Sequence, residues 1–192
     1  MEEFDFDQSS TWAKLYRIPV NGKILGYERA AKEIIVGKSQ EGLRQALQLK
    51  PGMNILLVGG GYGFIQEYWE DAGLGPIVTT DISNHIHQTK TENAVVPIYN
   101  ESALTEESRN NIQALFDGPI DVIITEDIIP CLTDQECAEL STALGIMCNN
   151  VVHWVTSLPC NYSVAMNWKT IQQWKDLLLN DYFVKRGTSE VL

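Results

Sequence analysis

The feature that most restricts the fold of this chain is a short apolar run that ends directly in glycines. Asn54 to Val58 (NILLV) is almost uniformly apolar, as is typical of a strand buried on both faces of a parallel sheet. Four glycines follow within positions 59–63, and the helix-like segment 64–72 (FIQEYWEDA) and the strand-like segment 76–82 (PIVTTDI) come next. A strand, a glycine turn, a helix and a second strand in this order predict a layered α/β fold.

The same alternation continues along the rest of the chain. Strand-like runs are predicted at 95–99, 120–125, 151–156 and 182–185, and helices at 26–36, 40–49, 105–116, 133–148 and 168–179. The expected helix starts are Thr105 before two glutamates, a capping box from Thr133 to Glu136, and Asn167 as a cap. Pro97 lacks an amide hydrogen, so the run that contains it is expected at a sheet edge or strand end. At least five strands alternating with helices predict a three-layer, doubly wound, mostly parallel sheet, preceded by an N-terminal helical segment.

Length and charge bound the organisation and the partners. The 192 residues predict one domain, 1–192, with an N-terminal segment at 1–38 and a core at 39–192. Fourteen basic and 25 acidic residues give a net charge of −11, which argues against nucleic acid and anionic membranes as partners. Without a signal-peptide pattern or an apolar run of membrane-spanning length, the expected location is cytoplasmic.

Neither the cysteines nor the paired histidines form a metal-binding pattern. Cys131, Cys137, Cys148 and Cys160 contain no C-x-x-C pair, so reduced, mostly buried thiols are expected. His85 and His87 lie two positions apart and would point to different sides of a helix or turn. The prediction is that the chain has no metal site.

The glycine turn and the acid that ends the next strand are the candidate ligand-binding features. Glycines allow positive φ angles and let a ligand lie on backbone amides near a helix N-terminus. A dinucleotide fingerprint, G-x-G-x-x-G, anchored at Gly59 would need a small residue where Phe64 stands. A nucleotide-dependent oxidoreductase is therefore a lower-ranked alternative. Asp81 can accept two hydrogen bonds from a vicinal diol. The competing interpretation is a plain turn followed by a surface acid.

The loop has the pattern G-x-G-x-G at Gly59, Gly61 and Gly63, and Asp81 follows 18 positions after Gly63. This arrangement resembles motif I and the ribose-binding acid of the class I S-adenosylmethionine-dependent methyltransferases, which have a Rossmann-like fold. The resemblance covers roughly residues 40 to 160. It implies S-adenosylmethionine as the cofactor, with Asp81 on the ribose hydroxyls, Ile82 on the adenine face, and Glu101, with Asn100 as the alternate, on the adenine amino group. The implied cofactor-binding set is Val58, Gly59, Gly60, Gly61, Gly63, Asp81, Ile82, Glu101, Ser102 and Glu126.

The resemblance also points to catalytic candidates. Glu126 and Asp127 follow the fourth strand and look like motif IV, where two carboxylates beside a sulfonium are electrostatically favourable and can accept a proton from the acceptor. His153, inside the fifth strand, is a third candidate, and the competing interpretation is a hydrogen-bonded core histidine. The N-P-P-Y and D-P-P-Y signatures of enzymes that methylate base amino groups are absent from the sequence.

The implied function is direct displacement of the methyl group by a small-molecule or peptidic acceptor. Leu57 stands where family members commonly carry an acid, so a non-catalytic cofactor- or partner-binding protein is the alternative. Aminopropyltransferases have a similar glycine turn, usually with Asp where this chain has Tyr62, and rank lower. The resemblance implies that segment 1–38 folds over the cofactor as a lid; the alternative is that its aromatic residues pack a helix onto the sheet. Few residues follow 182, so the usual terminal hairpin must be abbreviated, and a homodimer is a state to test.

Overall fold

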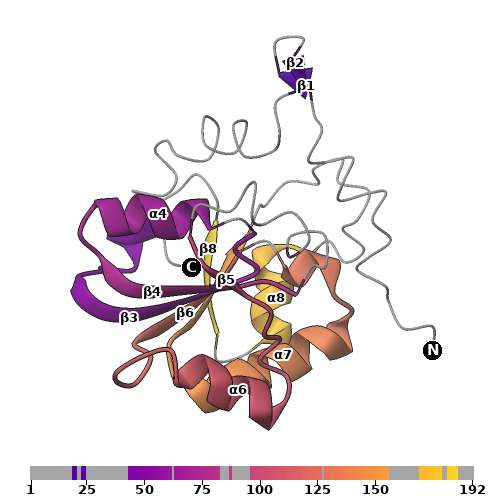
Figure 1. Cartoon of the computed structure of the whole chain (residues 1–192). Helices are drawn as coiled ribbons and strands as arrows, with labels where there is room; N and C mark the ends of the chain where they lie inside the picture. Colours follow the sequence, from indigo (N-terminus) through magenta and orange to yellow (C-terminus); the bar gives the residue numbers. More distant parts are fainter. Residues whose placement is uncertain are drawn as a thin grey trace.

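A computed structural model of the chain describes residues 19–20, 23–24, 43–61, 63–82, 87, 96–126, 128–155, 169–178 and 181–185. Six strands form the main sheet, and every pairing between neighbours in it is parallel. These strands are β3 (Pro51–Val58), β4 (Gly75–Thr80), β5 (Ile98–Tyr99), β6 (Val122–Glu126), β7 (Val151–Val155) and β8 (Tyr182–Lys185). Their order across the sheet, β5-β4-β3-β6-β7-β8, confirms the predicted doubly wound α/β architecture (Figure 1).

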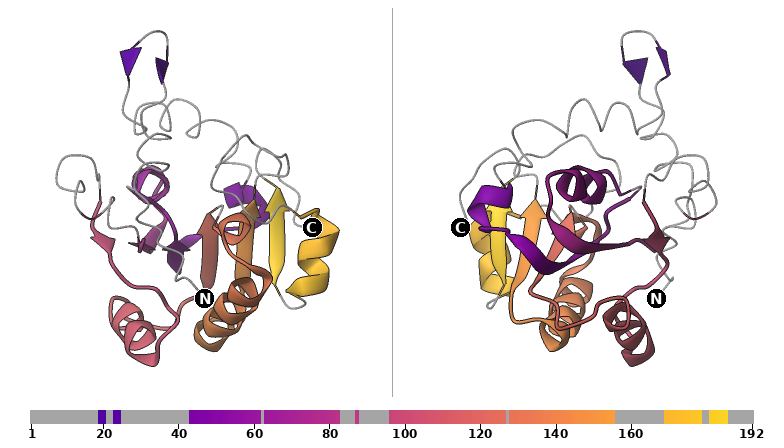
Figure 2. Two further views of the ribbon diagram at one scale, coloured as in Figure 1. Left: turned by 90° about the vertical axis from the view of Figure 1, so that its right-hand side faces the viewer. Right: turned by 60° about the vertical axis from the view of Figure 1, so that its left-hand side comes forward.

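Helices cover the sheet on both sides. They are α4 (Phe64–Asp71), α6 (Glu106–Gln113), α7 (Asp134–Met147) and α8 (Ile171–Leu177), with a short 3₁₀ turn, η1 (Ile129–Cys131). Helix α4 lies on one face, α6 and α7 lie on the other, and α8 lies beside β8 (Figures 1 and 2). The fold thus has the three predicted layers.

Side-chain alternation along the central strands builds a separate core on each face. In β3, Ile55 and Leu57 pack toward Trp69 of α4, whereas Leu56 and Val58 pack in the cluster that contains Ile112 of α6. All four strand residues are less than 9% exposed. A strand buried on both faces needs a continuous apolar sequence, which explains why NILLV does not alternate with polar residues.

Local sequence signals explain where most elements begin and end. Thr105 caps α6 by accepting a hydrogen bond from the amide of Ser108, and Thr133 and Glu136 form the predicted capping box of α7. Pro97 lies just outside β5, a two-residue strand at the edge of the main sheet. This position suits Pro97, because a proline has no amide hydrogen to donate to a neighbouring strand.

Helix α8 departs from the prediction at its start. Asn167 was the expected cap for a helix over 168–179, but α8 begins at Ile171 and Thr170 is its N-cap. The Thr170 hydroxyl accepts from the amide of Gln173, and the Gln173 side chain accepts from the amide of Thr170. This capping box satisfies two amides at once and outweighs a single asparagine cap.

The N-terminal segment is described at four positions only. β1 (Pro19–Val20) and β2 (Lys23–Ile24) pair as a small antiparallel sheet. The helix expected at 26–36 lies outside the described residues, and the helix expected at 40–49 is seen at 43–46, before a turn. The lid function of 1–38 and the division into segment and core stay predictions. In the part of the chain that the structure describes, no helix is long and apolar enough to cross a bilayer.

Candidate functional site

The winding direction of the sheet reverses at β3, and the glycine loop lies at that point. The chain passes from β3 outward to β4 and β5, then returns to place β6 on the other side of β3. Ligands of open α/β sheets bind beyond the carboxyl ends of the strands at such a reversal. The carboxyl ends of β3, β4 and β6 therefore form the candidate site.

Three glycines of the loop are packed tightly against the protein. A Cβ at Gly59 would collide with the side chain of Ile128, and one at Gly63 would collide with Val96. A Cβ at Gly60 would lie 2.6 Å from Cγ2 of Thr79. These three positions need glycine because the segments after β3, within β4, before β5 and after β6 meet here.

Gly61 differs from the other three. Like Gly59 and Gly63 it has a positive φ, here +57°, but among the described residues no heavy atom beyond its chain neighbours lies within 4 Å of the position its Cβ would take. Its amide donates a 3.0 Å hydrogen bond to Oδ2 of Asp81. The loop therefore presents an open backbone surface at Gly61, directly beside the carboxylate that ends the next strand.

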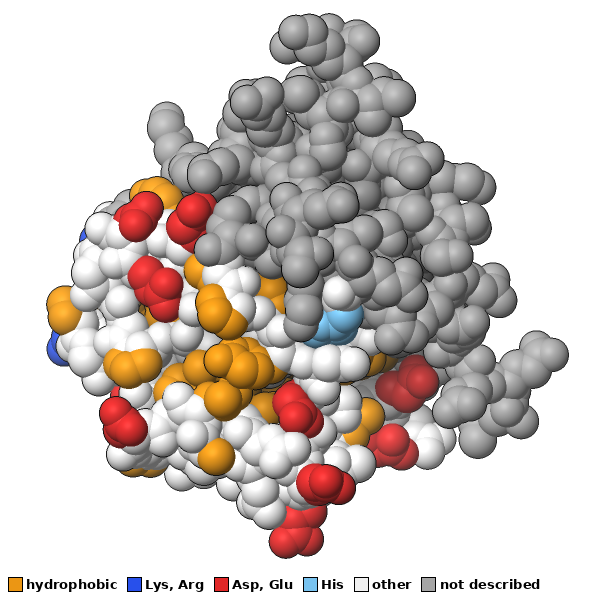
Figure 3. Space-filling view, viewed as in Figure 1, with side chains coloured by type: hydrophobic (Ala, Val, Ile, Leu, Met, Phe, Trp, Pro, Cys, Tyr) orange, Lys and Arg blue, Asp and Glu red, His pale blue; other side chains and the backbone are white. Residues whose placement is uncertain are grey.

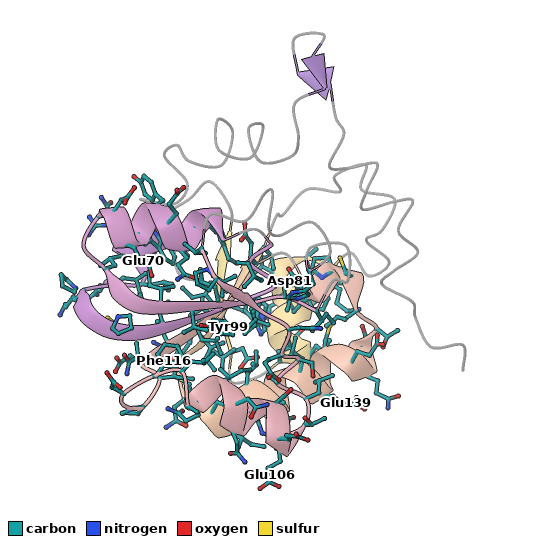
Figure 4. The ribbon with its side chains drawn as sticks, viewed as in Figure 1. Glu70, Asp81, Tyr99, Glu106, Phe116 and Glu139 are labelled. Atoms are coloured by element: carbon teal, nitrogen blue, oxygen red, sulfur yellow. The ribbon has the colours of Figure 1, made fainter. Side chains whose placement is uncertain are left out.

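Asp81 is held by hydrogen bonds from three neighbouring segments. Its amide donates to the carbonyl of Tyr99 over 3.0 Å, its carboxylate accepts from Gly61, and its carbonyl oxygen lies within hydrogen-bond distance of Nε2 of His87. Asp81 and Tyr99 are labelled in Figure 4. Such anchoring fixes the direction of a side chain before any ligand arrives. The next residue, Ile82, leaves 45% of its surface exposed although it is apolar.

A buried amide fixes helix α4 relative to the loop. Gln66 is 5% exposed, and its Nε2 donates to the carbonyl of Ile77 in β4 while its Oε1 accepts from the Thr79 hydroxyl. The side-chain amide of Gln66 therefore holds the first turns of α4 against β4. Helix α4 has Gly63 as its N-cap and therefore no side-chain cap, whereas α6, α7 and α8 are each capped by a threonine.

Glu101 and Ser102 lie after β5, as predicted, but Glu101 is already bonded to α6. Its two carboxylate oxygens accept hydrogen bonds from the Ser108 hydroxyl and from Nδ2 of Asn111, the latter at 3.0 Å. Ser102 accepts from the amide of Leu104. Binding of an adenine amino group by Glu101 stays a prediction, and Asn100, which is exposed, stays the alternate.

Glu126 ends β6, where it is half-buried at the candidate site. Its carbonyl oxygen is 3.7 Å from the position of a Cβ on Gly59, which places the end of β6 against the glycine loop. Asp127 lies outside the described residues. The catalytic roles of this carboxylate pair stay predictions.

His153 is a core residue with both ring nitrogens engaged. It is 0% exposed, Nδ1 is 2.8 Å from the Thr125 hydroxyl, and Nε2 is 2.7 Å from Oδ2 of Asp181. The three residues tie β6, β7 and the start of β8 together. Its proposed role as a base stays a prediction, and this geometry favours the competing interpretation of a hydrogen-bonded core histidine.

The described cysteines agree with the expectation of buried thiols. Cys131, Cys137 and Cys148 are buried, and no disulfide links these three. Burial and the nearby carboxylates of Asp134 and Glu136 raise the pKa of Cys137 to about 12, and burial raises the pKa of Cys148. Among the described residues, no three His, Cys, Asp or Glu side chains gather in a way that would hold a metal ion.

Solved structures identify the fold. Human N-acetylserotonin methyltransferase in complex with S-adenosylmethionine superposes with a TM-score of 0.59 at 16% identity, over 88% of this chain and 52% of that one. A methyltransferase from Archaeoglobus fulgidus gives 0.55 at 16% identity, over 80% and 72%. Magnesium protoporphyrin IX methyltransferase from Synechocystis PCC 6803 gives 0.55 at 14% identity, over 94% and 83%. The chain has a Rossmann-like methyltransferase fold.

The methyltransferase fold is evident from structure and not from overall sequence similarity. No protein-family model and no curated protein sequence matches the chain. The chain spans about half the length of the human enzyme.

One residue of the site escaped the sequence analysis. His87 was considered only for a metal pair with His85, yet it contacts the backbone of Asp81. Within this methyltransferase fold, that contact brings its imidazole to the carboxyl end of β4. The sequence signal was weak, because a histidine six positions after a strand-ending acid is compatible with any solvent-exposed turn.

Proposed function

We propose that this chain binds S-adenosylmethionine at the carboxyl edge of its sheet and catalyses transfer of the methyl group to a small-molecule or peptidic acceptor. The open surface at Gly61 is the observation that carries the proposal. At three loop glycines, other side chains of the protein occupy the space that a Cβ would take. At the fourth, Gly61, no such side chain is found among the described residues, and the position lies beside Asp81. A ligand that approaches the backbone there explains why the position is glycine.

The residues around Gly61 suit the adenosine half of the cofactor. An ionised carboxylate offers about four acceptor sites, so Asp81 can accept from two ribose hydroxyls while it keeps the amide of Gly61. Exposed Ile82 provides an apolar surface for the adenine ring. The N-terminus of α4, which lacks a side-chain cap, offers amides and a positive dipole end to the methionine carboxylate.

The chemistry asked of the protein is modest. When bound, S-adenosylmethionine supplies a methyl group that its sulfonium already activates. The chain then has to align an acceptor for in-line SN2 displacement and exclude competing water. We expect Glu126, at the end of β6, and its sequence neighbour Asp127 to take a proton from an acceptor amine or hydroxyl.

The charge of the chain favours a neutral or cationic acceptor. The net charge is −11, and in the described part of the face shown in Figure 3 acidic side chains are widely spread and basic ones are few. Such a surface repels polyanions, which supports a small molecule or peptide over nucleic acid. We also propose that the chain acts as one domain, and that a homodimer is the assembly to look for.

A binding protein without turnover is the second candidate. Leu57 occupies the position, two before Gly59, where the methyltransferase family commonly carries an acid, and it is 2% exposed within the core. Part of the usual hydrogen-bonding network for the methionine ammonium is thus missing. Methyl transfer from radiolabelled S-adenosylmethionine to a panel of small acceptors separates the two candidates once binding is established.

Calorimetric titration tests the proposal. Separate titrations with S-adenosylmethionine, S-adenosylhomocysteine and NADH should give saturable binding of the first two and none of the third. Binding of NADH alone would support the oxidoreductase alternative and refute the proposal. Saturable S-adenosylhomocysteine binding without turnover on any acceptor would support the second candidate.

A further inference from the structure

His87 carries an unused hydrogen-bond acceptor at the edge of the proposed cofactor site. Its Nε2 lies within hydrogen-bond distance of the carbonyl oxygen of Asp81. A carbonyl oxygen only accepts, so Nε2 carries the hydrogen. In the neutral imidazole, Nδ1 then has no hydrogen and can only accept.

The Nδ1 atom of His87 is buried, and none of the residues that the structure describes is its hydrogen-bond partner. Buried polar atoms in native proteins are nearly always hydrogen-bonded, so an exception calls for an explanation. Nε1 of Trp69 is also unpartnered, but that side chain is fully buried in the core between α4 and the sheet. His87 instead lies against Asp81, where the proposed ligand would bind.

We propose that Nδ1 of His87 accepts a hydrogen bond from the adenosine half of the cofactor, from a ribose hydroxyl or from the adenine amino group. This inference rests on the proposed function and names a specificity residue within the same site. The Nε2 contact fixes the orientation of the imidazole, and the same contact holds the backbone of Asp81. The two acceptors, Asp81 and His87, thereby form one rigid unit at the end of β4.

Such an acceptor selects among nucleoside ligands. A ligand that places a donor on Nδ1 satisfies a buried atom, and a ligand without that donor leaves it unsatisfied. Since the free protein already carries the unpartnered atom, a ligand with the donor gains binding free energy by satisfying it, and a ligand without the donor gains none. His87 should therefore discriminate between adenosine and analogues that lack one donor.

Nitrogen NMR on the unaltered protein tests the inference without any risk of misfolding. The chain has three histidines, and the spectrum of His87→Phe assigns the signals of His87. On saturation with S-adenosylhomocysteine, the unprotonated Nδ1 of His87 should shift upfield as it becomes hydrogen-bonded, while Nε2 stays protonated. An unchanged Nδ1 signal at saturation would overturn the inference.

Binding of ligand analogues provides the second test. His87→Phe, which keeps a planar ring, should weaken S-adenosylhomocysteine binding about tenfold, as expected for one lost hydrogen bond. His85→Phe is the matched control and should leave binding unchanged. Two analogues each lack one possible donor: one has 2′-deoxyribose, and the other has a purine without the amino group. The analogue that lacks the donor used by His87 should lose at most about twofold in affinity on the same substitution.

The possible outcomes distinguish failure of the His87 inference from failure of the proposed cofactor binding. Equal losses for all three ligands would mean that His87 acts only by positioning Asp81, and the inference would be wrong. Normal binding to His87→Phe would refute it as well. Absence of any S-adenosylhomocysteine binding to the unaltered protein would instead refute the proposed function, and the inference with it.

Discussion

Substitution of Gly61 by alanine separates a ligand-binding glycine from a glycine needed only for its backbone angle. At φ of +57° an alanine costs about 1–2 kcal/mol of stability, because its Cβ crowds the following carbonyl. No further cost is expected, since no other described residue, apart from the chain neighbours, lies within 4 Å of the new methyl group. Gly73 is the matched control: its φ is +78°, its Cβ position is equally open, and it follows α4 at the opposite end of the sheet.

Both variants should therefore lose a similar 1–2 kcal/mol in urea unfolding. Only Gly61→Ala should lose affinity for S-adenosylhomocysteine, by at least about tenfold, which corresponds to roughly 1.4 kcal/mol. Calorimetry on the two folded variants measures this difference. If Gly61→Ala binds as tightly as Gly73→Ala, the open space at Gly61 is not the ligand site and the reasoning from the glycine loop is wrong.

Further predictions concern the parts of the fold that support the site. Asp181→Ala should destabilise the protein by about 1–3 kcal/mol in urea unfolding, because Nε2 of His153 loses its buried partner. The affinity for S-adenosylhomocysteine should stay unchanged. A loss of affinity without a loss of stability would instead support His153 as a site residue. Thr170→Ala should cost about 1 kcal/mol and Asn167→Ala should cost nothing in urea unfolding, and the reverse result would contradict the α8 capping box. The unfolded thiol of Cys137 ionises near 9 and the folded one near 12, so stability should fall as the pH rises from 9 toward 12, and a Cys137→Ala variant should show a smaller fall.

Local signals in the sequence predicted most of the fold. The six strands of the main sheet were predicted, with bounds that differ by up to three residues, because buried parallel strands require continuous apolar runs, as at 54–58 and 120–125; the short strands β1 and β2 were not predicted. Capping by Thr105 and Thr133 was predicted because a threonine cap and its partners lie within three residues of each other. The misplaced start of α8 shows the limit of this reasoning: two possible caps lay three positions apart, and only the Thr170–Gln173 pair satisfies two amides.

The site was less predictable because its contacts join distant segments. The sequence indicated that the loop glycines matter, but not that Ile128 and Thr79 occupy the space beside Gly59 and Gly60 and leave Gly61 open. The bond between His153 and Asp181 spans 28 positions and exists only after β8 pairs with β7. Contacts of this kind depend on tertiary packing, which no local pattern encodes.

The hydrogen bond between Gly61 and Asp81 determines which variant of Asp81 gives a clear result. Asp81→Ala would remove the acceptor of the Gly61 amide and disturb the loop itself, so a loss of binding would be ambiguous. Asp81→Asn is the sharper variant, because the amide oxygen can still accept from Gly61. It removes the negative charge and half of the acceptor sites that a ribose diol would use.

Affinity of the unaltered protein and of Asp81→Asn for S-adenosylhomocysteine, compared with affinity for its 2′-deoxy analogue, tests the central claim most directly. If Asp81 holds the ribose hydroxyls, Asp81→Asn should lose about 1.5–3 kcal/mol with the complete ligand, as for hydrogen bonds to a charged group. It should lose much less with the analogue, which already lacks one hydroxyl. Equal losses with both ligands, or no binding of either ligand to the unaltered protein, would contradict the assignment of this site to S-adenosylmethionine.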